Sequence, residues 1–556
     1  MKKYLFLAIA LLGMASCTND DIADGNKPIH GGEVETSYIA INLNAANNTR
    51  AAGDTYQDGL AAERAVKSAY FFFFKNDGTA FPVTGSPATA PGGTVNWISA
   101  NLQDLGQGEN PNVSDIKDAV LVLSTYVGDY PSQIVAVLNW APVTGKAYNL
   151  DDLYDATNIQ GVDSGFVMSN AVYSDGTNAV VGTPLTVTNI FKSPADALAN
   201  PITIYVERIA AKVTVTAKDD VEENRFQVKK NNNNVSVTIG SSNIDVYVKV
   251  EGWELHNDFT QSKLLKEIHP AEWTDLGFTW NDAPYYRCYW ATSLTGWAAG
   301  ENAFPTTFSR ALGKQSNVND DKYTNNTYTY VGENTLYDTT NNGSTANCTK
   351  VILKAQLQQK DGEVFKPLAL ARWYTTYYAG TEDLLKAVAN TIKYQYCWKE
   401  GDKYTYISYE DLTVKKDGNL VKFQLSLTGE SRDWYIVDNS NSTNPYTSQT
   451  DDEMNTLLGG LEKALYYEDG YTLYYIDIAH LGNLGNNIPE AGDYGVVRNH
   501  IYNVVLNSFG GFGSPVYVPD GNLEYPEDPT DVKDYVSAEV RILSWRLVSQ
   551  EVDVQP

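Results

Sequence analysis

The chain has 556 residues, 43% of them hydrophobic and 20% charged, which is typical of folded proteins and predicts two or more domains. Its formal net charge is −27, and this excess of carboxylates excludes nucleic-acid binding, which calls for Lys and Arg. With 38 Tyr, 11 Trp and only 4 Met, the composition favours β-sheets.

Residues 1–17 have the pattern of a secretory signal peptide. Lys2 and Lys3 precede an apolar stretch, residues 4–15, that is too short to span a bilayer. The stretch ends in Met14-Ala-Ser-Cys17, which resembles a bacterial lipobox, where the Cys becomes the first mature residue and carries acyl chains such as palmitate. We therefore expect lipidation of Cys17. The alternative is that Cys17 is an ordinary signal-peptide residue.

A tether and a lone strand follow. Residues 18–35 are polar and read as a tether, and residues 38–43 alternate as in a short strand. The next segment is small and polar and contains Arg50, which makes it accessible to a trypsin-like protease. Arg64 is a nearby alternative site of cleavage.

Strands dominate the rest of the chain, and their spacing predicts β-sandwiches with Greek-key connections. The expected strands are residues 66–74, 119–123, 134–139, 202–216, 235–239, 244–255, 349–358, 421–427, 471–478 and 494–507.

Two helices and a long loop are also predicted. Thr450 and Glu453 form a capping box before a helix whose apolar side includes Leu465, and a second helix follows Thr381. Residues 311–347 are expected to be a surface loop. The Tyr-rich residues 371–409 are either a surface patch or core.

No pattern of catalytic or metal-binding residues stands out. The five His lack metalloprotease spacing, and Cys288, Cys348 and Cys397 allow one disulfide at most. Residues 509–513 are glycine-rich but are expected to form a turn, and residues 317–321 read as a solvated loop rather than a calcium site. We therefore predict a protein that is not an enzyme and needs no cofactor or metal.

The C-terminal stretch is a strong amphipathic strand that follows an acidic, proline-rich run, residues 522–531. Apolar residues alternate along it and change phase at Leu543, which indicates a bulge or a change of face. The apolar set is Val536, Ala538, Val540, Ile542, Trp545 and Leu547. Either this strand closes the chain's own sheet, or it pairs with another copy of the protein.

Several stretches together resemble the fimbrillins of Bacteroidota type V pili, most closely the Mfa-type stalk subunit. The similarity runs from Cys17 to the C-terminus, and no single motif in it is long. The stretches are Ala65-Val-Lys-Ser-Ala-Tyr-Phe-Phe-Phe-Phe-Lys-Asn-Asp-Gly78, residues 134–139, 166–170, 245–257 and 494–503, and Tyr205-Val-Glu-Arg-Ile-Ala-Ala-Lys-Val-Thr-Val215, which is similar to a family signature near the passage between domains.

The resemblance implies a mainly β fold: two β-sandwich domains of transthyretin-like, Greek-key type, with a few short helices. The expected divisions are a signal peptide (1–17), a propeptide with its strand (18–50), an N-terminal acceptor domain (51–212), a C-terminal domain (213–534) and a donor strand (535–556).

The resemblance also implies a mechanism. An arginine-specific surface protease cuts after Arg50, Ala51 becomes the N-terminus, and the strand 38–43 leaves a groove. The C-terminal strand of another copy fills that groove, because exposed sheet edges pair with added strands. The expected partners are further copies, anchor and tip subunits, and host or bacterial receptors. The expected location is a surface fimbrium, reached through an outer-membrane lipoprotein precursor.

Two other hypotheses about the function stay open. A cell-surface glycan-binding lipoprotein would share the signal peptide and the aromatic residues, but would need neither cleavage at Arg50 nor a donor strand. By the same resemblance, a fimbrial anchor would lack the maturation cleavage and keep its lipid, and a fimbrial tip would carry an added lectin-like domain and lack a usable donor strand.

Overall fold

The first unit of the fold is a curved sheet around a core of aromatic and branched side chains. Phe71 to Phe74 are all fully buried, since both faces of their strand are covered. The sheet order is β4-β7-β1-β14-β10-β8-β3-β5, and β6 and β13 join it beside β7 and β8. Its strands are β1 (Val34–Ala46), β3 (Ala69–Phe74), β4 (Thr84–Gly85), β5 (Trp97–Ser99), β6 (Gln103–Gly106), β7 (Val113–Tyr126), β8 (Gln133–Leu138), β10 (Met168–Asn170), β13 (Thr183–Pro184) and β14 (Ile202–Arg208).

The computed structural model describes most, but not all, of the chain. The described residues are 34–46, 55–56, 59–85, 95–106, 113–126, 130–230, 233–239, 242–274, 276, 280–282, 287–297, 302–315, 326–336, 345–426, 432–480, 491–516, 536–543 and 546–547. Within these residues, no helix is both long and apolar enough to cross a membrane.

The second unit is a two-layer sandwich. The chain leaves the first sheet at Arg208 and enters the next sheet at Ala210. One layer has the order β24-β15-β38-β40 with β25 beside β15, and the other has the order β16-β20-β26-β37-β39 with β19 and β27 at its sides. Val215 and Val504 of the first layer share one core with Val248 and Leu353 of the second, so the side chains between the layers hold the sandwich together.

The strands of the second unit span a large part of the sequence. They are β15 (Ala210–Ala217), β16 (Arg225–Gln227), β19 (Ser236–Ile239), β20 (Ser242–His256), β24 (Gly313–Lys314), β25 (Tyr328–Gly332), β26 (Lys350–Asp361), β27 (Val364–Pro367), β37 (Tyr471–Asp477), β38 (Ile501–Phe509), β39 (Ser514–Pro515) and β40 (Val536–Leu543). Short pairs complete the fold: β2 (Thr55–Tyr56) with β41 (Arg546–Leu547), β9 (Ala156–Asn158) with β21 (Gln261–Lys263), β11 (Tyr173–Ser174) with β12 (Ala179–Val180), β17 (Lys229–Lys230) with β18 (Asn233–Asn234), and β22 (Asn281–Asp282) with β23 (Arg287–Cys288).

A third unit is inserted between β27 and β37 and has a hydrophobic core of its own. The single C-terminal domain expected at residues 213–534 did not include such a separate core. The third unit holds a sheet of order β29-β28-β36-β33-β32, a sheet of order β31-β30-β34-β35, and two helices. The elements are β28 (Leu370–Trp373), β29 (Thr376–Ala379), α2 (Gly380–Ile392), β30 (Tyr396–Glu400), β31 (Lys403–Tyr406), β32 (Leu412–Asp417), β33 (Leu420–Leu425), β34 (Asp433–Val437), β35 (Tyr446–Gln449), α3 (Asp451–Gly459) and β36 (Ala464–Tyr467).

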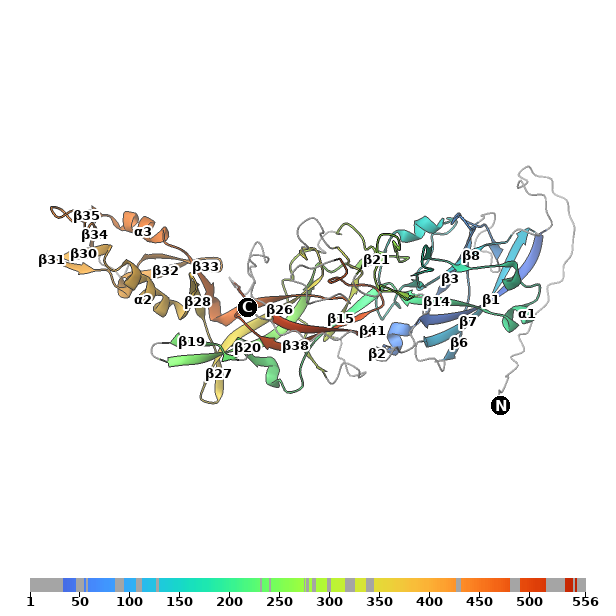
Figure 1. Cartoon of the computed structure of the whole chain (residues 1–556), viewed down its shortest axis with the longest axis horizontal. Helices are drawn as coiled ribbons and strands as arrows, with labels where there is room; N and C mark the ends of the chain where they lie inside the picture. The colour runs from blue at the N-terminus through green and yellow to red at the C-terminus, as the bar shows by residue number, and fades with distance from the viewer. Residues whose placement is uncertain are drawn as a thin grey trace.

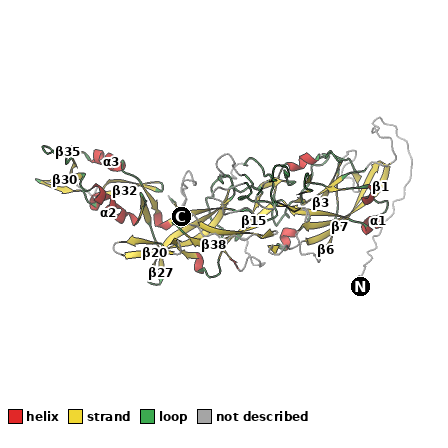
Figure 2. Ribbon diagram, viewed as in Figure 1, coloured by secondary structure: helices red, strands yellow, loops and turns green. Residues whose placement is uncertain are grey.

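The three units lie along the length of an elongated molecule. The first and third units are at opposite ends, and the second lies between them (Figure 1). Strands run through all three units, whereas helices are short and few in the described chain (Figure 2). The mainly β fold predicted from the sequence is therefore confirmed.

Several element boundaries differ from the expectation. The expected strand 202–216 is two strands that belong to different sheets, and the strand expected at 494–507 begins only at Ile501. The expected loop 311–347 contains β24 and β25, because β15 pairs with both. Leu465 lies in β36 rather than on the helix, since α3 ends at Gly459.

Candidate assembly site

Strand β1 lies inside the first sheet and not at its edge. It pairs antiparallel with β7 along most of its 13 residues and parallel with β14 over residues 41–45. Ile39 and Ile41 are 0% and 1% exposed and belong to the core. The predicted strand 38–43 is therefore present, and both of its backbone edges are used.

Further contacts fix the register of β1. Tyr38 exchanges two backbone hydrogen bonds with Phe191: its N–H donates over 2.7 Å and its C=O accepts over 2.9 Å. Helix α1 (Pro194–Ala199) lies against the strand. This helix begins at a Ser193 cap, whose Oγ accepts from the Asp196 N–H at 3.1 Å. The only strand that precedes Arg50 in the described chain is thus part of the packed core of the first unit.

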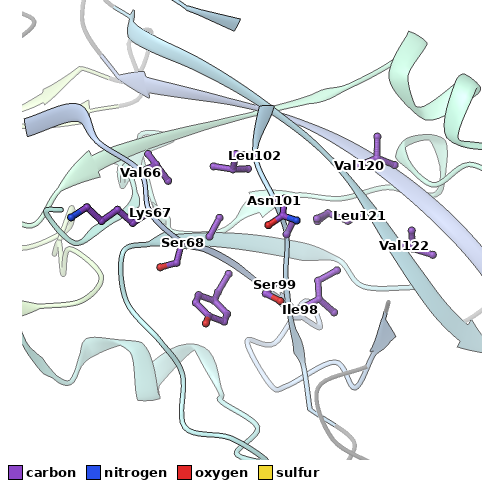
Figure 3. A pocket seen from close by; sticks show the side chains of 13 residues that line it. Val66, Lys67, Ser68, Ile98, Ser99, Asn101, Leu102, Val120, Leu121 and Val122 are labelled. Atoms are coloured by element: carbon purple, nitrogen blue, oxygen red, sulfur yellow. The ribbon is translucent and has the colours of Figure 1, made fainter. Parts of the chain in front are cut away.

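A cavity of about 640 Å³ opens beside β7 in the first unit (Figure 3). Residues 120–122 of β7 form part of its wall, and the same residues pair with residues 38–40 of β1. The cavity is lined by Val66, Lys67, Ser68, Ala69, Tyr70, Ile98, Ser99, Ala100, Asn101, Leu102, Val120, Leu121 and Val122. Open space therefore adjoins the position of β1.

The C-terminal strand is paired in this structure. β40 lies at the edge of its sheet, antiparallel to β38, with Val540 opposite Val504 and Ile542 opposite Tyr502. Of the two interpretations offered by the sequence, the structure shows the strand closing the chain's own sheet. Val536, Ala538, Val540 and Ile542 are in β40, Leu547 is in β41, and Trp545 lies outside the described residues.

The segment that follows the predicted cleavage site is tied to the same C-terminal region. Thr55 pairs with Leu547 and Tyr56 with Arg546, so β2 and β41 form a short ribbon. Cys17, Arg50 and Ala51, the predicted lipidation and processing residues, lie outside the described residues.

Glu63 ties the start of the first unit to the second unit. It lies on a short 3₁₀ helix, η1 (Ala61–Arg64), and is fully buried. Its Oε1 accepts a hydrogen bond from Lys212 Nζ at 2.7 Å and another from the hydroxyl of Tyr330, and its backbone oxygen accepts from Arg208 Nε at 2.8 Å.

The pKa of Glu63 reflects these contacts. Burial alone raises the pKa of the carboxyl, but the ammonium of Lys212 and the donated hydrogen bonds outweigh burial, so the pKa lies below its ordinary value. Burial and the adjacent carboxylate raise the pKa of Tyr330, and burial lowers that of Arg208 to about 10. The carboxylate therefore stays charged inside the protein, held by its partners.

The other features expected from sequence have simple places in the fold. Cys288, Cys348 and Cys397 are free and buried. The glycine-rich residues 509–513 connect β38 to β39 without a helix, and Gly513 has φ +67° where an added Cβ would lie 2.5 Å from the Leu473 oxygen. Residues 317–321 lie outside the described residues. In the part of the chain that the structure describes, no group of three or more His, Cys, Asp or Glu is placed to hold a metal.

The C-terminal part of the chain is similar to a known protein family. Residues 465–551 match the family model described as major fimbrial subunit protein type IV, fimbrillin, C-terminal. The match includes β37, β38 and β40, and the resemblance to fimbrillins is confirmed. It supports a role as a fimbrial subunit at the cell surface.

The solved structures that this chain matches include fimbrial proteins. The fimbrillin FimA of Porphyromonas gingivalis W83 is 13% identical, with 92% of this chain and 98% of that chain covered and a TM-score of 0.35. The tip fimbrial protein Mfa3 of Porphyromonas gingivalis is 11% identical, with 92% and 100% covered and a TM-score of 0.29. A fimbrial assembly protein of Parabacteroides distasonis is 10% identical, with 75% and 100% covered and a TM-score of 0.26.

No curated protein sequence matches this chain. Because the TM-scores of the three solved structures are all below 0.5, the similarity to fimbrillins rests on the sequence match at residues 465–551.

Proposed function

We propose that this chain is the stalk subunit of a surface fimbria. It is exported as a lipoprotein acylated at Cys17, cut after Arg50, and joined head-to-tail to further copies by donor-strand exchange. The observation that carries the proposal is the position of β1, which precedes Arg50 in the sequence and has backbone partners on both sides. Removing it would leave β7 and β14 with two facing unpaired edges, which is a template for an added strand.

The C-terminal strand suits the vacated position in length and pattern. β40 and β41 run from Val536 to Leu547, close to the 13 residues of β1. Val540 and Ile542 are two positions apart, as are the core residues Ile39 and Ile41 of β1. As an edge strand, β40 has backbone bonds to β38 alone within the described sheet, so it leaves at a lower cost than an internal strand.

The two sites lie in different units, which sets the geometry of assembly. The acceptor is in the first unit, and the donor strand belongs to the sheet of the second. A contact between different surfaces of identical subunits is heterologous and extends as a filament when it does not close into a ring. Further copies are therefore the main partners, with anchor and tip subunits and an arginine-specific protease as accessory partners.

The position of Arg64 supports the choice of Arg50 as the site of cleavage. Arg64 lies in η1, directly after the fully buried Glu63 with its ion pair to Lys212. A protease needs an extended segment, which η1 can supply only by breaking these buried contacts.

Fimbrillins are structural proteins, which agrees with the prediction that this chain is not an enzyme.

The test is intact-mass measurement and N-terminal sequencing of protein sheared from its native cell surface, with unboiled samples on a denaturing gel. We expect chains that begin at Ala51 and a ladder of multimers that heating dissociates. Lipidated chains that begin at Cys17 and run only as monomers would refute the proposal. They would favour an anchor subunit or a glycan-binding lipoprotein.

A further inference from the structure

The four-stranded sheet of the third unit has one face on its core and one face turned outward. Tyr396, Ile407 and Trp434 on the inner face belong to the hydrophobic core of this unit. Residues directly opposite each other on paired strands point to the same face, and the two faces alternate along each strand. Cys397 is opposite both Tyr406 and Tyr435, so these two tyrosines lie on the outer face.

Five tyrosines cluster on this outer side, and we call them the tyrosine face: Tyr394, Tyr404, Tyr406, Tyr435 and Tyr446. Tyr404 and Tyr446 stack in parallel with ring centroids 3.8 Å apart, and Tyr435 meets Tyr404 edge to face at 5.4 Å. Tyr394 and Tyr406 meet edge to face at 5.2 Å.

The rings hold one another in place and still reach solvent. Cys397 on the same face is fully buried, so the rings cover the sheet itself. Tyr394 and Tyr406 are 62% and 42% exposed, and the other three tyrosines are partly exposed. A set of aromatic rings fixed by mutual packing is a rigid surface that loses little side-chain entropy on binding.

The polar ends of these side chains are available. Among the residues that the structure describes, no hydrogen bond joins any of the five phenolic hydroxyls to a protein group. Each hydroxyl can both donate and accept. Apolar ring area and unpaired hydroxyl groups thus alternate over one small surface.

The surface carries charges of both signs and has a polar border. Lys393 Nζ lies 5.6 Å from the centroid of the Tyr394 ring. Lys399 and Asp433 are directly opposite on the outer face, one positive and one negative, and Lys399 Nζ lies 5.4 Å from the centroid of the Tyr404 ring. The exposed turn between β34 and β35 adds hydroxyl and amide groups from Asn439, Ser442, Thr443 and Asn444, whereas Asp438 and Asn441 accept hydrogen bonds within the turn.

We propose that the tyrosine face binds uncharged oligosaccharides. A sugar ring has an apolar face of C–H groups that packs on an aromatic ring, and an edge of hydroxyls that pairs with phenolic, amide and carboxylate groups. An acidic ligand is disfavoured by a chain of net charge −27, and a lipid or apolar protein surface would leave the hydroxyls without partners.

The location fits a contact with surroundings rather than with assembly partners. The β31-β30-β34-β35 sheet lies at the end of the molecule opposite the first unit, which holds the proposed acceptor (Figure 1). The inference does not depend on donor-strand exchange, because the face is complete in one subunit.

The test applies the full-length chain to a printed array of uncharged oligosaccharides together with sialylated and sulfated ones, followed by titration calorimetry with each oligosaccharide that binds. We expect binding to uncharged members and at least tenfold weaker binding by the double variant Tyr394→Ala/Tyr406→Ala. The matched control is Tyr374→Ala, since Tyr374 is 66% exposed in the same unit but in the turn between β28 and β29. The control should bind as the wild type does.

Circular dichroism and thermal unfolding establish that each variant is folded. The variant Tyr394→Phe/Tyr406→Phe keeps the rings and removes two hydroxyls, and should lose part of the affinity. The proposal is overturned if the wild type binds no uncharged oligosaccharide, if the double Ala variant binds equally well, or if only sialylated or sulfated members bind. Loss of a protein partner by the Ala variant without any glycan binding would equally overturn it. Multimer formation, scored separately, reports on the proposed function.

Discussion

At the scale of single residues, the contacts of Glu63 decide how the first unit meets the second. The Lys212–Glu63 ion pair is buried on both sides, with side-chain exposures of 7% and 0%. A second buried pair joins Lys266, in the segment after β21, to Glu207 of β14 at 2.9 Å. Buried charges contribute little net stability when paired, but removing one partner leaves the other charge uncompensated.

Lys212→Met is therefore expected to lower the free energy of unfolding by about 3–5 kcal/mol, as measured by urea denaturation. The matched control is Lys386→Met, which breaks an exposed pair with Glu382 and should cost less than about 1 kcal/mol. Equal effects of the two substitutions would show that the buried pair has no special role.

The same carboxyl predicts a pH dependence. Because the folded pKa of Glu63 lies below its ordinary value of 4.5, its contribution to stability is complete above pH 4.5 and is lost as the pH falls through the folded pKa. Glu63→Gln should flatten this part of the stability curve, measured as urea midpoints between pH 3 and 6. An unchanged slope would mean that other carboxyls account for the loss.

At the scale of elements, the start of a helix is set by neighbouring residues, whereas the place of a strand is set by the strands that pair with it. The capping box of α3 is local: Thr450 Oγ1 accepts from the Glu453 N–H at 3.2 Å, and Glu453 Oε2 accepts from the Thr450 N–H at 2.8 Å. Thr450→Ala should destabilise the third unit by about 1 kcal/mol in urea unfolding. Thr456→Ala, which changes a threonine in the body of the same helix, serves as the control and should cost less.

The pairing of β1 offers a sharper test of donor-strand exchange. Ala40 and Val120 are directly opposite on antiparallel strands, at a separation that a disulfide can bridge. The variant Ala40→Cys/Val120→Cys should keep β1 in its sheet after cleavage and block multimers on unboiled gels, until a reductant restores them.

The control for that experiment uses another pair of opposite residues on β7. Thr84→Cys/Ser124→Cys links β4 to β7 without holding β1, so it should assemble normally. The three native cysteines that follow the predicted cleavage site, Cys288, Cys348 and Cys397, are buried and free, which limits competing disulfides. Multimers formed by oxidised Ala40→Cys/Val120→Cys would show that β1 need not leave.

At the scale of the whole molecule, the proposed function requires two ends that act on different copies. Deleting residues 535–556 should leave folded, secreted, cleaved monomers, because β40 is an edge strand and β38 keeps its pairing with β15. Such monomers should still accept the C-terminal strand of intact subunits. Polymers built from the truncated chain alone would rule out the C-terminus as donor.

The sequence by itself determined the local features of this protein. The strands with alternating side chains and the cap of α3 depend on neighbouring residues, so they can be predicted from order and spacing. The signal peptide and the lipobox are predicted in the same way and remain predictions. The fimbrillin resemblance was also visible in short stretches, and the C-terminal match confirms it. The domain divisions, Cys17, Arg50 and the donor residues remain predictions.

Only the tertiary structure decided where those elements go. The strand at residues 38–43 became an internal strand because β7 and β14, far along the chain, provide both of its edges. The C-terminal strand pairs with β38. Residues 371–464 contain a separate core, and five tyrosines cluster on the outer side of one of its sheets. Strand pairing joins residues that are distant in sequence, and no local pattern specifies which edge a strand will meet.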